Sequence, residues 1–332
     1  MKNMFVLVLL VLAGVPLFGQ IQDYRAYQKS IHAAELKLVR GQKQEALDKY
    51  QEVLISAKGN FVKDVYNALL LADELKETGC FFELLELLLP KNLSNDYLKS
   101  LKVFNKQNND PRWQAFLAAN KKAKVPEREL RARLEGLARD DQYFRTKEGS
   151  YDVYGDTINH IDSINIAALL DLIANNRFPG EAKIGVQDIR GKQPMDIIFH
   201  HYCQSTSVKT QKRVVTPELI SLVQAGKILP NKCGLWLEMQ KGQFKTGVFT
   251  VLSFRINGKN SDWYVPILSN EDLMLVKQTR EMLGMESLEE YYEKIRFGLS
   301  NPDVAYVFDV KKNIFEGDQE LFQSVTKSMR KL

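Results

Sequence analysis

The sequence has few of the residues that build disulfide frameworks and metal sites. Only three of its 332 residues are cysteine (Cys80, Cys203 and Cys233), and only four are histidine. Cysteines that are widely spaced and odd in number match neither a disulfide framework nor a zinc pattern. Two alternatives stay open: a Cys203–Cys233 bridge in an oxidising compartment, or three buried thiols.

Common enzyme motifs and strong positive charge are also missing. The chain has no Gly-x-Ser-x-Gly elbow, no P-loop and no glycine fingerprint for a dinucleotide. Its 46 basic and 41 acidic residues are mixed along the chain and give a net charge of only +5. We expect no nucleic-acid partner, because such a partner calls for a dense basic cluster. No pattern assigns a cofactor or a metal.

After residue 20 no apolar run is long enough to span a membrane. The chain opens with Lys2, an apolar run from Met4 to Phe18, and a small residue, Gly19. A positive start, a short apolar run and a small residue are typical of a secretory signal peptide. We predict a signal peptide at 1–19 and an exported protein, periplasmic or secreted. An uncleaved anchor is the alternative, although the run is shorter than the roughly 20 residues of a spanning helix.

Residues 20–124 show paired helical patterns similar to tetratricopeptide repeats. In "IHAAELKLVRGQKQEALDKYQEVL" the two small packing positions of such a repeat are Ala34 and Ala46, and the turn glycine is Gly41. The aromatic position is Tyr50, and the closing apolar position is Val53. A second pair contains Ala68 and Gly79, and a degenerate third contains Trp113 and Phe116. We predict a tetratricopeptide-like helical arm of three antiparallel pairs, whose concave side is the candidate surface for a protein or peptide partner. Alternatively, the arm folds back on the rest of the chain through Trp113 and Phe116.

Residues 125–332 are predicted to form a mainly helical domain with a β-hairpin. Helices are expected over 126–148, from Asp162 or Ser163 to about 176, from about 194, over 216–226, 270–284 and 287–297, and from about Asp318. Strands are expected over 234–240, 247–256, 262–268 and 304–310, with a hairpin turn at Asn257-Gly258. The fold class is therefore mainly α (α+β): tetratricopeptide-like helical hairpins followed by a helical domain with a small antiparallel β-hairpin.

One helix of this domain carries a charge on its apolar stripe. At 100° per residue, Asp141 falls in the arc of Leu130, Leu134, Leu137 and Phe144. Arg145 follows one turn later, within ion-pairing range. Because an isolated buried carboxylate is costly, we predict a buried Asp141–Arg145 pair. Gln142 projects to a more exposed side.

The region from about 127 to 294 resembles an uncharacterised bacterial domain family found in exported proteins of the Bacteroidetes type. The resemblance rests on "DDQYFR", on Asn165 at a helix start, on "RFPGEAKIG", "IIFHHY" and "LVQAGKI", and on "TREMLGMESLEEYYEKI". The family's Asp-Arg pair after the fourth helix is replaced here by "LEMQ", and its Tyr-Gly-Thr-Gln run is absent. The resemblance implies a domain and no reaction. Of the two consecutive histidines, His201 matches the family histidine, since Ile197 precedes it by one turn on the apolar side.

Two hypotheses of function remain. The favoured one is an exported interaction or ligand-binding protein, supported by the repeat pattern and the missing motifs. The alternative is a hydrolase-like enzyme, or a degenerate descendant, whose catalytic candidates are Asp141, Arg145, Asn165 and His201. His160 and Asp162 have a spacing compatible with metal ligation, but they lack a third ligand. The sequence assigns no oligomeric state.

Overall fold

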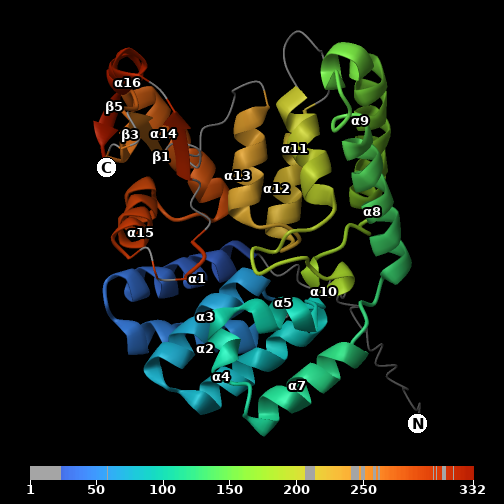
Figure 1. Cartoon of the computed structure of the whole chain (residues 1–332), viewed down its shortest axis with the longest axis vertical. Coiled ribbons are helices and arrows are strands. Elements are labelled where there is room, and N and C mark those ends of the chain that lie inside the picture. The colour runs from blue at the N-terminus through green and yellow to red at the C-terminus, as the bar shows by residue number, and fades with distance from the viewer. Residues whose placement is uncertain are drawn as a thin grey trace, which may run out of the picture.

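A computed structural model describes residues 24–332, except 58, 206–213, 241–246, 248–250, 257–258, 261, 302, 304, 309–311 and 317. The predicted signal peptide lies outside the described residues. Helices predominate, as predicted, and a small sheet lies near the C-terminus (Figure 1). Within the described ranges, no helix is long and apolar enough to cross a membrane.

The first part of the chain, here called the arm, is a stack of short helices. They are α1 (Tyr24–Val39), α2 (Lys43–Ser56), α3 (Val62–Leu75), α4 (Thr78–Leu85), the 3-10 helix η1 (Glu86–Lys91), α5 (Asn95–Ser100), α6 (Lys102–Asn105) and α7 (Pro111–Lys122). Ala34 and Ala46 are fully buried where α1 packs on α2. Gly41 turns the chain between these helices with a φ of +82°, a conformation that favours glycine. The tetratricopeptide-like character of the arm stays a prediction.

The third predicted helix pair consists of three helices rather than two. Leu101 is extended and separates α5 from α6. Asp110 then caps α7, accepting a hydrogen bond from the Arg112 amide at 2.8 Å, with Pro111 in the first turn. Trp113 stacks on Phe104 and Phe116 inside the arm's core, with the first pair of ring centroids 5.0 Å apart. The expected contact of Trp113 and Phe116 with the second half is therefore wrong.

Among its described residues, the second part begins with six helices of nine or more residues and one four-residue helix. They are α8 (Arg128–Tyr143), α9 (Ser150–Ala174), α10 (Glu181–Ile184), α11 (Met195–Ser205), α12 (Thr216–Gln224), α13 (Pro230–Met239) and α14 (Asn270–Leu283). Helix α9 starts at Ser150, so the predicted cap at Asp162 or Ser163 is wrong and both residues lie inside the helix. The predicted strand over 234–240 is also wrong. Residues 234–239 lie in α13, which begins at Pro230 and places Cys233 and Trp236 in the hydrophobic core.

Within the described residues the sheet has five strands in the order β2-β1-β3-β5, with β4 pairing β1. They are β1 (Val251–Ile256), β2 (Lys259–Asn260), β3 (Tyr264–Pro266), β4 (Lys312–Glu316) and β5 (Met329–Lys331), accompanied by α15 (Leu288–Ser300) and α16 (Gln319–Thr326). The predicted hairpin is present as the antiparallel pair β1–β2, while its Asn257-Gly258 turn lies outside the described residues. Strand β4 runs parallel to β1. The predicted strand over 304–310 is not formed by residues 305–308; Tyr306, Val307 and Phe308 pack on the arm instead.

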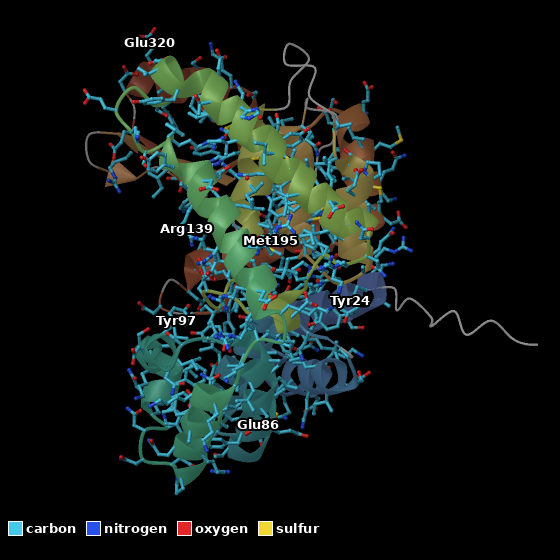
Figure 2. All side chains as sticks on the ribbon, turned by 90° about the vertical axis from the view of Figure 1, so that its right-hand side faces the viewer. Tyr24, Glu86, Tyr97, Arg139, Met195 and Glu320 are labelled. Carbon is cyan, nitrogen blue, oxygen red and sulfur yellow. The ribbon has the colours of Figure 1, made fainter. Side chains whose placement is uncertain are left out.

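The arm is docked against the second half through its first helix. Helix α1 lies beneath α15 and α12 (Figure 1). Gly226 and Gly284, which end α12 and α14 with positive φ, allow this approach: an added Cβ would come within 2.5 Å of the Tyr24 ring and 3.0 Å of the Arg25 backbone, respectively. Figure 2 shows Tyr24 at the level where the two parts meet, with Glu86 of the arm below it and Met195 of the second part above it. Of the two predicted arrangements, the structure shows the docked arm.

Buried charges connect the two parts. The ammonium of Lys294 on α15 contacts Glu35 on α1 and the Glu286 carboxylate, the latter at 3.0 Å. Lys63 on α3 approaches the second Glu35 oxygen at 3.1 Å. Burial opposes ionisation of Glu35, but Lys294 and Lys63 outweigh it and hold its pKa well below the usual value. A second buried pair joins Lys91 of η1 to Glu181 of α10 at 3.2 Å.

Candidate functional site

The predicted polar residues lie on three helices that pack together. Helix α11 packs on both α8 and α9. Asp141 comes from the stripe of α8 and is 1 % exposed, as its place among the leucines predicts. Arg145 follows the end of α8, and its Nη1 lies 3.2 Å from Asp141 Oδ1 with a side chain 7 % exposed. The predicted buried ion pair is confirmed.

Arg145 has a second acidic partner that the sequence reasoning assigned to other roles. Its Nη2 donates to Asp162 Oδ1 of α9 at 2.7 Å, and Asp162 is 1 % exposed. Burial lowers the pKa of Arg145, but its hydrogen bond to Asp162 and the charge of Asp141 raise this pKa by more. Arg145 therefore bridges α8 and α9 as a permanent cation.

His201 of α11 completes a tight group around Asp141. Its Nδ1 lies 2.6 Å from Asp141 Oδ2, as expected for the histidine nearer the apolar face. Gln142, which the helical projection placed on a more exposed side, donates from Nε2 to the same carboxylate oxygen at 2.7 Å and so belongs to this group. At about 100° from Asp141, Gln142 faces the neighbouring α11 rather than open solvent, and its Nε2 is 3.5 Å from His201 Nδ1.

Asn165 lies on α9 but serves a different contact. It is 2 % exposed, and its Nδ2 donates to the backbone carbonyl of Leu137 at 3.1 Å. The four candidates thus lie on the same three packed helices, but only Asp141, Arg145 and His201 touch one another. Three of these four side chains are nearly sealed from solvent, and His201 is the most accessible at 15 %. This arrangement is typical of a structural network that fixes three helices.

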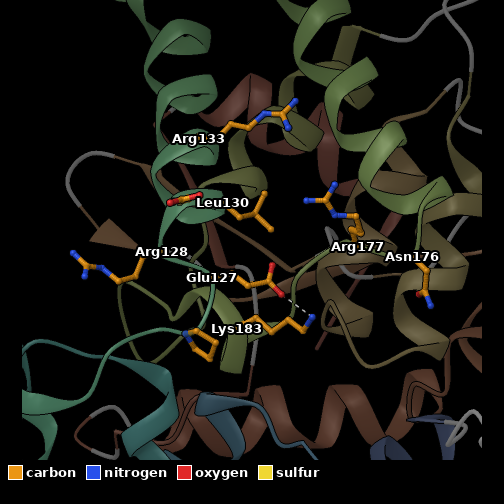
Figure 3. A pocket seen from close by; sticks show the side chains of 9 residues that line it. Glu127, Arg128, Leu130, Arg133, Asn176, Arg177 and Lys183 are labelled. Carbon is orange, nitrogen blue, oxygen red and sulfur yellow. Dashed lines mark hydrogen bonds and ion pairs between the residues drawn. The ribbon is translucent and has the colours of Figure 1, made fainter.

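A different, open cavity lies where α8 begins. It has a volume of about 600 Å³ and is lined by Pro126, Glu127, Arg128, Glu129, Leu130, Arg133, Asn176, Arg177 and Lys183. Figure 3 shows Leu130 and Arg133 projecting from α8 toward Arg177, whose side chain points back at them across this space, whereas Arg128 extends away. We call it the basic pocket.

Local structure explains how these side chains are presented. Asn176 adopts a left-handed φ of +53° at the end of α9, and the Arg177 amide donates back to the Leu172 carbonyl at 2.7 Å, which turns Arg177 toward α8. The Glu127 amide donates to the Lys183 carbonyl at 3.0 Å, and the two side chains form a salt bridge of 2.7 Å. These bonds hold the start of α8 against α10.

The electrostatics of the basic pocket favour an anion. Lys183 is neutralised by Glu127, but among the described residues the guanidinium groups of Arg133 and Arg177 have no hydrogen bond or ion pair to a protein group. Burial, and then the charge of nearby Lys183, lowers the pKa of Lys227. Helix α8 also begins without a side-chain cap, so its first amides are available to a negative group. The guanidinium groups of Arg133 and Arg177 and the start of α8 thus supply positive charge to the pocket, against the carboxylate of Glu129 in the first turn of the helix.

The sequence offered no signal for the basic pocket. Arg133 is one of several arginines spaced along an amphipathic helix, and such a row is indistinguishable from an ordinary solvated face. Arg177 follows a turn whose direction depends on the left-handed conformation of Asn176.

The cysteines form no disulfide, and burial disfavours the thiolate form of Cys203 and Cys233. All three cysteines are free thiols; burial raises the pKa of Cys203 to about 12 and that of Cys233 well above its usual value. In the part of the chain that the structure describes, no group of three or more His, Cys, Asp or Glu could hold a metal ion.

No protein-family model, no curated protein and no solved structure matches this chain. The resemblance to an uncharacterised bacterial domain family over residues 127–294 stays a prediction.

Proposed function

We propose that the protein is an exported ligand-binding protein that holds a small polar oxyanion, a carboxylate or phosphate compound, in the basic pocket. The observation that carries this proposal is the pair of guanidinium groups of Arg133 and Arg177, which face a cavity of about 600 Å³ without an acidic partner among the described residues. That volume lies in the range of small-molecule sites.

The chemistry of arginine narrows the ligand. A guanidinium is planar, permanently charged and suited to two parallel hydrogen bonds with a carboxylate or phosphate. Leu130 and Pro126 are the apolar residues of the lining, so most of the ligand surface meets polar groups. A ligand with two or more oxyanions would satisfy Arg133 and Arg177 together. Because both side chains are exposed, the attraction is screened by salt, and affinity should fall as ionic strength rises.

Calorimetric titration with citrate, inorganic phosphate and glucose 6-phosphate tests this proposal. The chain with Arg133→Ala and Arg177→Ala should lose binding by about 100-fold, since two charged hydrogen-bonding groups contribute about 1.5 kcal/mol each. Arg139→Ala is the matched control, because Arg139 is an exposed arginine of α8 outside the pocket. The proposal fails if none of the probes binds the native chain, or if the double variant and the control bind equally.

The export part of the proposal rests on the pattern of residues 1–19. Expression of the full chain in a bacterium, followed by cell fractionation and N-terminal sequencing, should recover a chain that starts near Gln20 outside the cytoplasm. A chain that retains Met1 would contradict the predicted cleavage.

A hydrolase-like function is a second candidate, favoured by the contact of 2.6 Å between Asp141 Oδ2 and His201 Nδ1. A buried carboxylate that orients a histidine through Nδ1 leaves Nε2 to act as a base on water. Hydrolysis of p-nitrophenyl acetate should then be lost in His201→Gln and kept in His160→Gln, a control at an exposed histidine of α9. Equal rates in the two variants would exclude this function for that substrate class.

A further inference from the structure

An extended segment that follows α15 packs into the arm. Ala305–Phe308 has no helix or strand structure, and Val307 and Phe308 belong to the arm's hydrophobic core, with exposures of 5 % and 7 %. This segment lies more than 180 positions beyond the last arm helix in the sequence. The arm therefore already binds one extended piece of chain through a defined surface.

The side-chain amide of Asn67 on α3 forms hydrogen bonds with both backbone groups of Val307. Its Nδ2 donates to the Val307 carbonyl at 2.9 Å, and its Oδ1 accepts from the Val307 amide at 2.8 Å. A neighbouring β-strand satisfies a residue with the same pair of hydrogen bonds. Asn67 is fully buried, so an emptied surface would leave its amide in an apolar setting with two bonds lost. Both hydrogen bonds go to backbone atoms, so Asn67 can bind any residue with a free amide at the position of Val307.

Side chains on either side of this clamp supply selectivity. The Tyr306 hydroxyl donates to Glu74 Oε2 at the end of α3, at 2.8 Å. Burial, and then the hydrogen bond to Glu74, raises the pKa of Tyr306, so the hydroxyl stays a donor. The Phe308 ring contacts the rings of Tyr306 and Phe297, with centroids 6.0 Å away in each case. The segment therefore presents an aromatic, an aliphatic and an aromatic side chain, and the second aromatic ring contacts Phe297 of α15 while it packs in the arm's hydrophobic cluster.

We propose that the α3 surface around Asn67 is a peptide-binding groove for an extended aromatic–aliphatic–aromatic segment, which the chain's own Tyr306–Phe308 fills in cis. The link through α15 keeps the segment at a high local concentration, typically millimolar, so the groove is occupied at rest. This inference concerns a different surface from the basic pocket and does not depend on it.

A cavity beside the segment shows which peptide would bind more strongly than the cis occupant. It has a volume of about 240 Å³, and its lining includes Leu70, Val103 and Ala305. Ala305 is an exposed residue of this lining, which also includes the charged residues Asp73, Glu74, Lys102, Lys106 and Asp303. A peptide with leucine at that position would bury additional apolar surface and should bind more tightly than one with alanine.

Peptide complementation in the full-length chain tests the proposal. The groove is emptied by Tyr306→Ser, Val307→Ser and Phe308→Ser, and circular dichroism checks that the helices remain. The probe is a fluorescein-labelled peptide, Gly-Ser-Ala-Tyr-Val-Phe-Ser-Gly, followed by fluorescence anisotropy. We expect saturable binding to the emptied chain, binding at least about tenfold weaker to the native chain, and tighter binding when leucine replaces the alanine.

Asn67→Ala in the emptied chain should weaken peptide binding by about tenfold, which corresponds to about 1.4 kcal/mol. Asn120→Ala is the control, because Asn120 is a buried arm asparagine that bonds the Leu93 carbonyl far from α3 in sequence. If the triple variant does not fold, Val307→Pro provides the emptied chain, because proline lacks the backbone amide that donates to Asn67 Oδ1. The proposal is overturned if a folded, emptied chain shows no saturable binding, binds a scrambled peptide equally well, or is insensitive to Asn67→Ala.

Discussion

Replacement of Asp141 by alanine is the sharpest test of how the three-helix polar group works. The substitution removes a carboxylate that is 1 % exposed and contacts Arg145 at 3.2 Å, His201 at 2.6 Å and Gln142 at 2.7 Å. Breaking a buried ion pair usually costs about 3–5 kcal/mol of unfolding free energy. Here Arg145 keeps Asp162 as a partner at 2.7 Å, so we expect about 3 kcal/mol, the lower end of that range.

Urea unfolding followed by circular dichroism measures this loss. Asp140→Ala is the matched control, because Asp140 is the exposed neighbour on α8 and should change stability by less than about 0.5 kcal/mol. Asp162→Ala and the double variant complete a cycle. With both acids removed Arg145 is buried without a carboxylate, so the double loss should exceed the sum of the single losses by about 1 kcal/mol or more. Equal midpoints for Asp141→Ala and Asp140→Ala would refute the reasoning.

Three further predictions follow from the packing and the titrations. Ala46→Phe should destabilise the arm by about 1–3 kcal/mol in thermal unfolding, because Ala46 is fully buried between α1 and α2, while the exposed Gln44→Phe should not. Burial opposes ionisation of Glu286, but His32, Lys294 and Arg280 lower its pKa to about 2. This folded pKa lies below the unfolded value near 4.5, so ionised Glu286 stabilises the fold fully above about pH 4.5, and this stabilisation is lost as pH falls toward about 2. Unfolding measured at graded pH should show a smaller loss of stability at low pH in Glu286→Gln. A thiol reagent at pH 8 should label at most Cys80 in the folded chain and all three cysteines in denaturant; rapid labelling of all three in the folded chain would contradict the burial of the other two.

Local patterns in the sequence were sufficient for the helical class and for the most buried polar residue. The stripe of Leu130, Leu134 and Leu137 placed Asp141 inside, and the spacing of four placed Arg145 within reach of it, since both depend only on the helical period. The same period chose His201 over His200. Asp162, the second carboxylate that binds Arg145, was predicted to cap a helix. It lies instead inside α9, because this long, kinked helix begins at Ser150.

Contacts distant in sequence decided the rest. The segment around Val307 reads as a strand by composition, but Asn67 offers its backbone the two hydrogen bonds that a strand would provide, so it packs on α3. The basic pocket depends on the turn at Asn176, which brings Arg177 opposite Arg133 across helices that the sequence does not place side by side. Periodicity fixes which face of a helix is buried, whereas the partner of that face, and the direction of an exposed arginine, depend on long-range packing that no local pattern encodes.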